Sequence, residues 1–224
     1  PDAGDFSSAR FDPALELSPH LERLFSDVKN VGHKRAGTAN LYIRGSRSRS
    51  QLKSLPAGFV VLDEVDEMLQ ANVPLAFERM SGHEEKQSFL LSTPTIEGHG
   101  INGYFDMSSQ DHFFFKCPHC SRWTELVEEC LKITAESVRD HDRIMESHVE
   151  CKECNTKLEH QKKHEWLAED NVKWVQGYSN RISRGFYVNQ LYSFTVKPYE
   201  LALSKLKGLT DPADEQEYWN SKLG

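Results

Sequence analysis

Two C-x-x-C pairs are the feature that most constrains how this chain can fold. They are Cys117-Pro-His-Cys120 and Cys151-Lys-Glu-Cys154, and thirty residues separate them. Each pair makes a tight turn that aims two thiolates at one point, and two such turns complete a tetrahedral sulfur shell suited to Zn²⁺. Because four protein ligands leave no open coordination position, we expect these cysteines to hold a structural zinc in a two-knuckle ribbon.

Other interpretations of the cysteines remain open at this point. The four thiols could be buried without a ligand or form a redox pair, and two nearby histidines, His119 and His148, could replace a cysteine in the shell. The fifth cysteine, Cys130, has no partner and is expected to be a small packed side chain.

A second feature is an apolar run that ends in acids, within the stretch GFVVLDEVDEM at 58–68. The run Phe59–Leu62 has the length of a strand, and a continuous apolar run suits a buried parallel strand. A hydrophobic strand followed by two acids is typical of phosphate-loop NTPases. Asp63 would hold Mg²⁺, and Glu64 would act as general base on the attacking water. The alternative is a strand that ends in solvated acids.

A second strand candidate lies downstream at 86–92, and it runs into Ser-Thr-Pro-Thr at 92–95. The residues between the two strands, 66–80, are predicted to be helical with a break at Pro74. The order strand, helix, strand predicts an α/β unit with a parallel sheet, in which ligands bind at the carboxyl ends of the strands. There the hydroxyls of Ser92 and Thr93 could sense the γ-phosphate of a nucleotide.

The charge of the chain is uneven. The net charge is −7, which argues against a general binder of polyanions, yet the residues between Tyr42 and Leu62 include four bases and no acid. These bases, predicted to lie on a polar loop that contacts phosphate or DNA, are Arg44, Arg47, Arg49 and Lys53. The alternative is a solvated basic surface. Against a complete nucleotide site, no G-x-x-x-x-G-K-[ST] loop occurs in the 224 residues.

The rest of the chain gives weaker signals. The predicted elements are helices at 19–28 (begun by Ser18-Pro19), 134–150, 198–207 and 211–221, and strands at 40–43 and 185–192. No apolar run approaches the ~20 residues of a membrane helix, and no basic-then-apolar leader opens the chain.

Five motifs in order resemble one known family, the large terminase subunit of tailed phages of the lambda-like GpA type. The motifs are PDAGDF at 1–6, GSRSRSQLKSLPAGFVVLDEVDEM at 45–68, LLSTPTIEGHGI at 90–101, FFFKCPHC at 113–120 with the later CKEC, and FYVNQLYSF at 186–194 with the closing YWNSKLG. The resemblance covers nearly the whole chain.

The resemblance implies a fold and a division of the chain. The fold is α/β, part of a phosphate-loop NTPase (ASCE-type) parallel sheet, with an inserted two-knuckle zinc ribbon and a C-terminal α/β lid or linker segment. Residues 1–110 would form the ATPase core fragment, 111–165 the zinc-ribbon insertion, and 166–224 the end of the ATPase domain toward a nuclease. The phosphate loop would then lie upstream of residue 1 and the nuclease beyond residue 224.

The resemblance also implies a function: an ATPase that couples hydrolysis to translocation of double-stranded DNA into a capsid. ATP, Mg²⁺ and Zn²⁺ would be its cofactors. DNA, the small terminase subunit, the portal protein and further copies of itself would be its partners, in the host cytoplasm. The complete protein would also carry an endonuclease, and this segment alone is expected to be inactive.

Family roles carry over to the matching residues. Asp63 matches the Mg²⁺ acid, Glu64 the catalytic base, and Ser92 with Thr93 the coupling motif. One departure is Lys53, which stands where the family more often has Arg. Lysine keeps the charge but loses the planar fork, so Arg47 or Arg49 could supply the cation that acts on the ATP of a neighbouring subunit.

Two other functions compete with this interpretation. One is a helicase-like ATPase of another family, with DEVD as its hydrolysis motif and STPT as its coupling motif. The other is a non-enzymatic zinc-ribbon module that binds nucleic acid or protein and carries an inactive NTPase scaffold.

Overall fold

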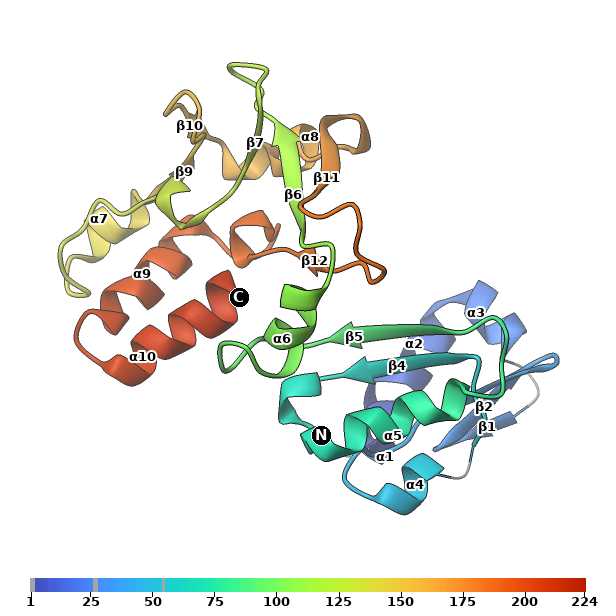
Figure 1. Cartoon of the computed structure of the whole chain (residues 1–224). Helices are drawn as coiled ribbons and strands as arrows, with labels where there is room; N and C mark the ends of the chain where they lie inside the picture. Colours follow the sequence, from blue (N-terminus) through green and yellow to red (C-terminus); the bar gives the residue numbers. More distant parts are fainter. Residues whose placement is uncertain (1–2, 26–27, 54) are drawn as a thin grey trace. The chain divides into compact units, whose positions relative to one another are not determined.

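The computed structural model describes residues 3–25, 28–53 and 55–224, and the chain divides into two compact units, Pro1–Leu91 and Ser92–Gly224 (Figure 1). We call them unit 1 and unit 2. No described helix has both the length and the apolar character that crossing a membrane requires.

Unit 1 combines short helices with two small sheets. Its helices are α1 (Ala3–Phe6), the π-helix η1 (Ser7–Phe11), α2 (Asp12–Leu17), α3 (Pro19–Leu24), α4 (Arg49–Lys53), α5 (Val73–Phe77) and the 3₁₀ turns η2 (Val65–Glu67), η3 (Gln70–Asn72) and η4 (Glu78–Met80). Its strands are β1 (Val28–Asn30), β2 (His33–Ala36), β3 (Ala39–Tyr42), β4 (Phe59–Asp63) and β5 (Gln87–Leu91). Strands β1, β2 and β3 form an antiparallel meander, whereas β4 and β5 pair in parallel.

The helix α3 begins where the sequence predicts. Ser18 is the N-cap of α3, and its side chain accepts a hydrogen bond from the backbone N–H of Leu21. The predicted helix at 19–28 is too long, because α3 ends at Leu24 and β1 starts at Val28. Residues 26 and 27 of that prediction lie outside the described residues.

The strand, helix, strand order of unit 1 is confirmed as a parallel pair. Phe59 to Asp63 of β4 run in register beside Gln87 to Leu91 of β5. The intervening residues form short turns rather than one helix, and Pro74 lies in the first turn of α5, where its missing N–H costs no hydrogen bond. Proline therefore starts a helix here instead of breaking one.

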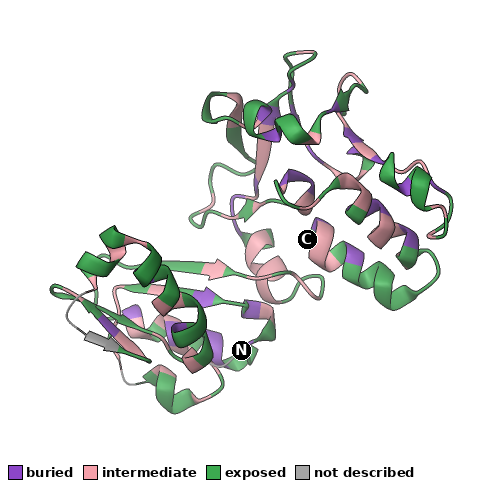
Figure 2. Cartoon of the chain, turned by 180° about the vertical axis from the view of Figure 1, so that it is seen from behind, coloured by how far each residue is buried: buried purple, intermediate pink, exposed green. Residues whose placement is uncertain are grey.

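The prediction that β4 is a buried strand is wrong for one face of the pair. Leu62 is 7% exposed, but Val61 is 51% and Phe89 is 47% exposed. Figure 2 shows the two neighbouring strands largely in the colour of exposed residues. Parallel sheets usually carry cover on both faces, and in the described structure β4 and β5 pair only with each other.

The sequence predicts that the basic stretch between 44 and 53 is a loop, but its second half forms the helix α4. Arg49 and Lys53 are the first and last residues of α4, four positions apart, and therefore project from the same side of one helical turn. Arg44 and Arg47 lie in the irregular chain that leads into it, with Arg47 at a bend. Ser54, which follows Lys53, lies outside the described residues.

Unit 2 contains the remaining elements. Its strands are β6 (Asp111–Lys116), β7 (Trp123–Glu125), β8 (Leu131–Lys132), β9 (His148–Glu150), β10 (Lys157–Leu158), β11 (Val172–Gln176) and β12 (Phe186–Tyr187). Its helices are α6 (Gly100–Met107), α7 (His141–Met145), α8 (Lys163–Trp166), α9 (Pro198–Gly208) and α10 (Pro212–Glu217), with the 3₁₀ turns η5 (Glu128–Cys130), η6 (His160–Lys162), η7 (Glu169–Asn171) and η8 (Gln190–Tyr192) and the π-helix η9 (Tyr218–Leu223).

Strand β6 organises unit 2. It pairs antiparallel with β11 along one edge, and with β12 (parallel) and β7 (antiparallel) along the other. A smaller antiparallel sheet has the order β10-β9-β8. One apolar core joins the cysteine segments to the end of the chain, since Phe115, Cys117 and Cys151 belong to the same buried cluster as Leu201 and Tyr218.

Two sequence predictions in unit 2 are wrong. The helix predicted at 134–150 shrinks to α7, because a turn closed by the Asp140 N–H to the Ser137 carbonyl precedes it and β9 follows. The strand predicted at 185–192 stops at Tyr187, because the side chain of Asn189 accepts a hydrogen bond from the Leu191 N–H and turns the chain into η8. The helix predicted at 198–207 is confirmed as α9.

Candidate functional site

The four cysteines that the sequence singled out come together. The sulfur atoms of Cys117, Cys120, Cys151 and Cys154 all lie within 4.8 Å of one another, and no disulfide joins them. Four thiolates at this spacing fit the tetrahedral sulfur shell of a zinc ion.

The two cysteine turns have the same hydrogen-bond pattern. In each turn the backbone N–H two residues after the first cysteine donates to that sulfur over 3.4 Å, from His119 to Cys117 and from Glu153 to Cys151. The residue after the second cysteine has a positive φ in both, 58° at Ser121 and 53° at Asn155. This repetition indicates that both turns are built for the same task, holding sulfur atoms toward one point.

Polar bonds also connect one turn to the other. The guanidinium of Arg122 donates to the Glu153 carbonyl over 3.0 Å and pairs with its carboxylate over 3.4 Å. His119 contacts the Lys157 carbonyl through Nε2, and His148 pairs with Glu150. Neither histidine belongs to the sulfur cluster, so the all-cysteine set is the one that the structure assembles.

The cluster holds its thiols in contrasting environments. Burial raises the pKa of Cys151 to about 12 and also raises the pKa of Cys117, whereas a hydrogen bond with Thr156 lowers the pKa of Cys154 to about 6. A divalent cation among the sulfurs would offset the cost of burying thiolate charge. Metal affinity should therefore decrease as the pH is lowered, because the thiols become protonated.

Cys130 is separate from the cluster, as the sequence predicts. Its side chain is 1% exposed, lies in the apolar core, and contacts the Glu125 carbonyl. Burial raises the pKa of this thiol, which makes it a poor nucleophile and suits a packing role.

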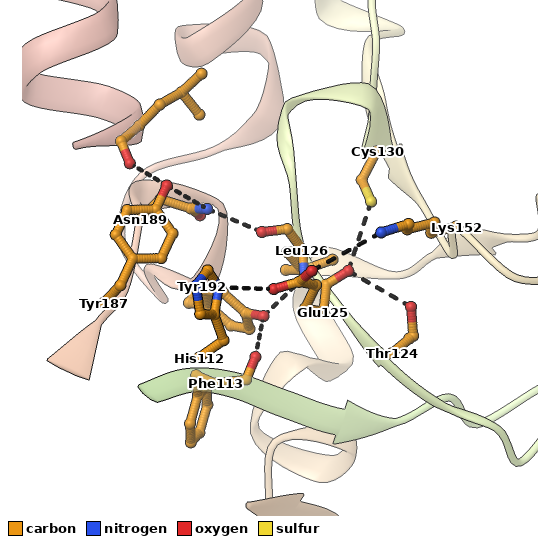
Figure 3. A network of polar contacts seen from close by, with 11 residues as sticks. His112, Phe113, Thr124, Glu125, Leu126, Cys130, Lys152, Tyr187, Asn189 and Tyr192 are labelled. Carbon is orange, nitrogen blue, oxygen red and sulfur yellow. Dashed lines mark hydrogen bonds and ion pairs between the residues drawn. The ribbon is translucent and has the colours of Figure 1, made fainter. Parts of the chain in front are cut away.

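A polar network connects the second cysteine turn to the sheet of unit 2 (Figure 3). Glu125 on β7 pairs with Lys152, which lies between the two cysteines of that turn, and also with His112 on β6. The Tyr192 hydroxyl accepts a hydrogen bond from the Leu126 N–H over 2.7 Å and donates to the Phe113 carbonyl. The cysteine turns are thus fastened to β6 and β7 by side chains as well as by the shared core.

The predicted hydrolysis acids stand at the end of the parallel pair. Asp63 is the last residue of β4, is paired in register with Leu91, and is exposed. Glu64 is exposed as well, and its backbone is left-handed, with φ 55° and ψ 53°. A non-glycine residue in this region is uncommon and strained, and such strain clusters at functional sites.

The predicted coupling residues directly follow β5. Within unit 2, Ser92 and Thr93 line a cavity of about 530 Å³, together with residues of 188–194 and 220–224. The Ser92 hydroxyl donates to the Thr93 carbonyl over 3.2 Å, and Asn220 donates to the Thr95 carbonyl over 3.4 Å. The coupling segment therefore contacts the last turn of unit 2.

Sequence reasoning missed the residues that support these motifs. In the sequence these residues look like ordinary surface charges. They are the bonded pair Arg122 and Glu153, the ion pair of Lys152 with Glu125, and Glu64 with its left-handed backbone. It also missed Lys163, which is 3% exposed and donates through Nζ to the carbonyls of Leu191 and Ser193 over 2.8 and 2.7 Å.

Comparison with known families identifies the chain. The family model described as "Phage terminase large subunit gpA, ATPase domain" matches residues 1–174, which is more than half of the chain and includes the strand-end acids, STPT and both cysteine pairs. Comparisons with the curated proteins and with the solved structures gave no match. The chain thus belongs to the family of gpA-type phage terminase large subunits, in the ATPase region.

Proposed function

We propose that this chain supplies the water-and-metal half of the ATP site of a DNA-packaging motor and couples hydrolysis to translocation of double-stranded DNA. The observation that carries the proposal is the parallel β4–β5 pair, which ends in Asp63 on one strand and leads into Ser92 and Thr93 on the other. Membership of the terminase ATPase family supports the nucleotide and the motor role.

The two acids take different tasks in this proposal. Asp63, at the end of β4, would hold the Mg²⁺ that neutralises phosphate charge. Glu64 would accept a proton from the attacking water, and its left-handed backbone turns it out of the strand direction. Both carboxylates are exposed, as they must be to meet a nucleotide.

The coupling task falls to the segment after β5. Ser92 and Thr93 have hydroxyls that can follow the presence or loss of a γ-phosphate, and the same residues line the cavity in unit 2. The bond from Asn220 to Thr95 gives the segment a contact with η9. Movement of the segment would therefore displace η9, the C-terminal turn of unit 2, through this hydrogen bond.

The cysteine cluster has a supporting role in the proposal. Zinc held by the four sulfurs would fix the two turns against β6 and β7, with no open position for catalysis. The exposed bases of the 44–53 stretch, among them Arg49 and Lys53 on one side of α4, would contact phosphate of ATP or DNA.

Coupling is tested by comparing ATP hydrolysed with DNA packaged in the terminase large subunit that carries this chain. The double variant Ser92→Ala/Thr93→Ala should hydrolyse ATP but package at least about tenfold less DNA per ATP, because the hydroxyls that sense the γ-phosphate are gone. Ser81→Ala, which removes an exposed hydroxyl bonded to the Glu78 carbonyl, is the matched control. An unchanged ratio in the double variant would exclude the coupling role.

A further inference from the structure

One segment of unit 2 has a composition unlike the rest of the chain. Residues 171–199 contain four bases, seven aromatic residues and no acid, so all 34 acids of this acidic protein lie elsewhere. Interleaved basic and aromatic residues are typical of surfaces that bind nucleic acid. Tyr192 belongs to the network of the cysteine turns and residues within 188–194 line the cavity beside Ser92 and Thr93, which leaves residues 171–186 without an assigned role.

The structure exposes much of this aromatic content. Trp174 on β11 is 41% exposed, Phe186 on β12 is 47% exposed, and their ring centroids are 5.0 Å apart. Both residues pair with odd-numbered positions of β6, Phe113 and Asp111, so their side chains project from the same face of the sheet. Large rings left open to solvent side by side provide a stacking surface.

The loop between β11 and β12, residues 177–185, projects from unit 2 (Figure 1). Its base is fixed to the chain before β6: the N–H of Tyr178 donates to the Ser109 carbonyl, and the N–H of Ser109 donates to the Ser183 carbonyl, each over 2.9 Å. At its tip, Ile182 has a relative exposure of 103%. A fully exposed isoleucine on an anchored loop has no role in packing.

The bases of the loop differ in how their charge is compensated. Arg184 pairs with the buried carboxylate of Asp111, so it anchors the loop. Arg181 donates to the carbonyls of Asp106 and Ser108 and has no carboxylate partner among the described residues. Its guanidinium lies 3.6 Å from the centroid of the Tyr178 ring. The loop therefore presents an uncompensated cation stacked on an exposed aromatic ring.

Lys173 adds a second such pair beside the loop. Its ammonium lies 4.1 Å from the centroid of the Trp123 ring, and no described carboxylate lies within ion-pair distance. Residues 173 and 174 alternate across β11, so this pair is on the opposite face from Trp174. Lys173 therefore places a positive charge on the face of β11 opposite to Trp174.

We propose that the loop 177–185 and the adjoining sheet face that carries Trp174 and Phe186 form a DNA-contacting surface of the terminase. Arg181 would meet phosphate, and Tyr178, Ile182 and the neighbouring rings would contact bases or sugars. Apolar wedges flanked by arginine are used to enter stacked bases, and exposed rings stack on unpaired ones. A protein partner would explain the apolar residues equally well. It would not explain the complete lack of acid over 29 residues in a chain of net charge −7.

The test uses two charges at one position that has no packing role. Ile182→Glu and Ile182→Lys place opposite charges at the loop tip, and Leu209→Glu with Leu209→Lys are matched controls, because Leu209 is 70% exposed at the end of α9. Each terminase large subunit variant is titrated without nucleotide at several salt concentrations. The probes are a labelled duplex of about 30 base pairs and a single strand of equal length, since phosphate contacts make affinity salt-dependent.

Opposite shifts are the expected result. Ile182→Glu should weaken DNA binding about tenfold, whereas Ile182→Lys should tighten it severalfold and steepen the salt slope by about one. The controls should shift less than about twofold, and the probe with the larger Ile182 effect identifies duplex or single strand as the ligand. Unchanged affinity in both Ile182 variants would overturn the proposal. If both variants reduce packaging without changing DNA affinity, the loop docks on protein instead.

This inference rests on the proposed function only for the choice of DNA as the polyanion. The readout contains no ATP, so a failed DNA result leaves the roles of Asp63 and Glu64 untouched. Conversely, normal ATP turnover in a Glu64→Gln variant would leave the DNA result standing.

Discussion

The two units of this chain hold their key residues in opposite ways. Unit 2 holds its cysteine cluster in and against an apolar core: Cys117 and Cys151 are at most 1% exposed, and Cys120 and Cys154 are partly buried beside them. Unit 1 presents Asp63 and Glu64 to solvent at the end of a strand pair of which one face is open. Buried thiolates need a cation to be stable, whereas carboxylates that act on a nucleotide need access to it.

The two motifs therefore differ in the surrounding structure that they require. The cysteine turns are specified locally, by repeated N–H to sulfur bonds, and the metal they fit would contribute directly to folding. The acids require only a strand that ends at the right place. We therefore expect disruption of the cysteine cluster to cost unit 2 far more folding stability than disruption of the strand-end acids costs unit 1.

The largest effect is expected from removing a cysteine of the cluster. Cys151→Ser should abolish binding of one zinc per chain and unfold much of unit 2, since structural zinc contributes about 10 kcal/mol in small zinc domains. Because the same core contains Leu201 and Tyr218, amides of α9 and η9 should lose protection along with the cysteine turns. Metal analysis and hydrogen exchange check both outcomes.

Cys130 provides the matched control for that experiment. It is equally buried but outside the cluster, so Cys130→Ala should keep one zinc and cost only about 1–2 kcal/mol of unfolding free energy. A melting profile that chelation leaves unchanged would contradict the zinc assignment.

A smaller effect is expected inside unit 1, where adjacent residues of β4 face different surroundings. Leu62→Ala should cost about 2–4 kcal/mol of unfolding free energy because Leu62 is almost completely buried. Val61→Ala should cost less than about 1 kcal/mol because half of Val61 is exposed. Urea unfolding measures both, and equal costs would mean that the open face of the pair is covered.

A pH-dependent effect, rather than a fixed cost, concerns Lys163, which unit 2 buries against two carbonyls. Burial lowers the pKa of this amine from 10.5 to about 8. Between these values the unfolded chain binds a proton that the folded chain does not, so stability should rise with pH from about 8 to 10.5 and fall as the pH drops through 8. The full gain is at most roughly 3 kcal/mol.

Lys163→Met isolates this contribution. The variant loses the bonds to Leu191 and Ser193 and should also lose this part of the rise in stability above pH 8, as measured by urea unfolding at pH 7.5 and 9. Identical pH slopes in the variant and the wild type would show that the amine stays protonated in the folded chain.

Short-range signals in the sequence predict the local structure well. Continuous apolar runs predict β4 and β5, Ser18 predicts the start of α3, and the cysteine spacing predicts the sulfur cluster. The two strands and the helix start each depend on residues within a few positions of one another, whereas the cluster joins two local turns that are thirty residues apart. The neighbouring residues are therefore sufficient to predict the local structure at these positions.

What the sequence could not predict depends on distant partners. The helix expected at 134–150 fails because Ala135 and Ile144 pack on Leu206 of α9, which favours a turn over a continuous helix. Asn189 ends β12 partly through its bond to Leu126, 63 positions away. The division into 1–110, 111–165 and 166–224 stays a prediction, and the structure adds that the cysteine turns share their core with the C-terminal segment.

The role of Glu64 as the catalytic base is tested most directly by ATP turnover of the terminase large subunit with Glu64→Gln, measured together with nucleotide binding. Removing the base should lower turnover by at least about 10²-fold while binding of MgATP stays within about twofold. Glu67→Gln, an exposed acid three residues along the chain, should behave as wild type. Normal turnover in Glu64→Gln would show that Glu64 is not the base and that the strand-end acids of unit 1 are not the hydrolysis site.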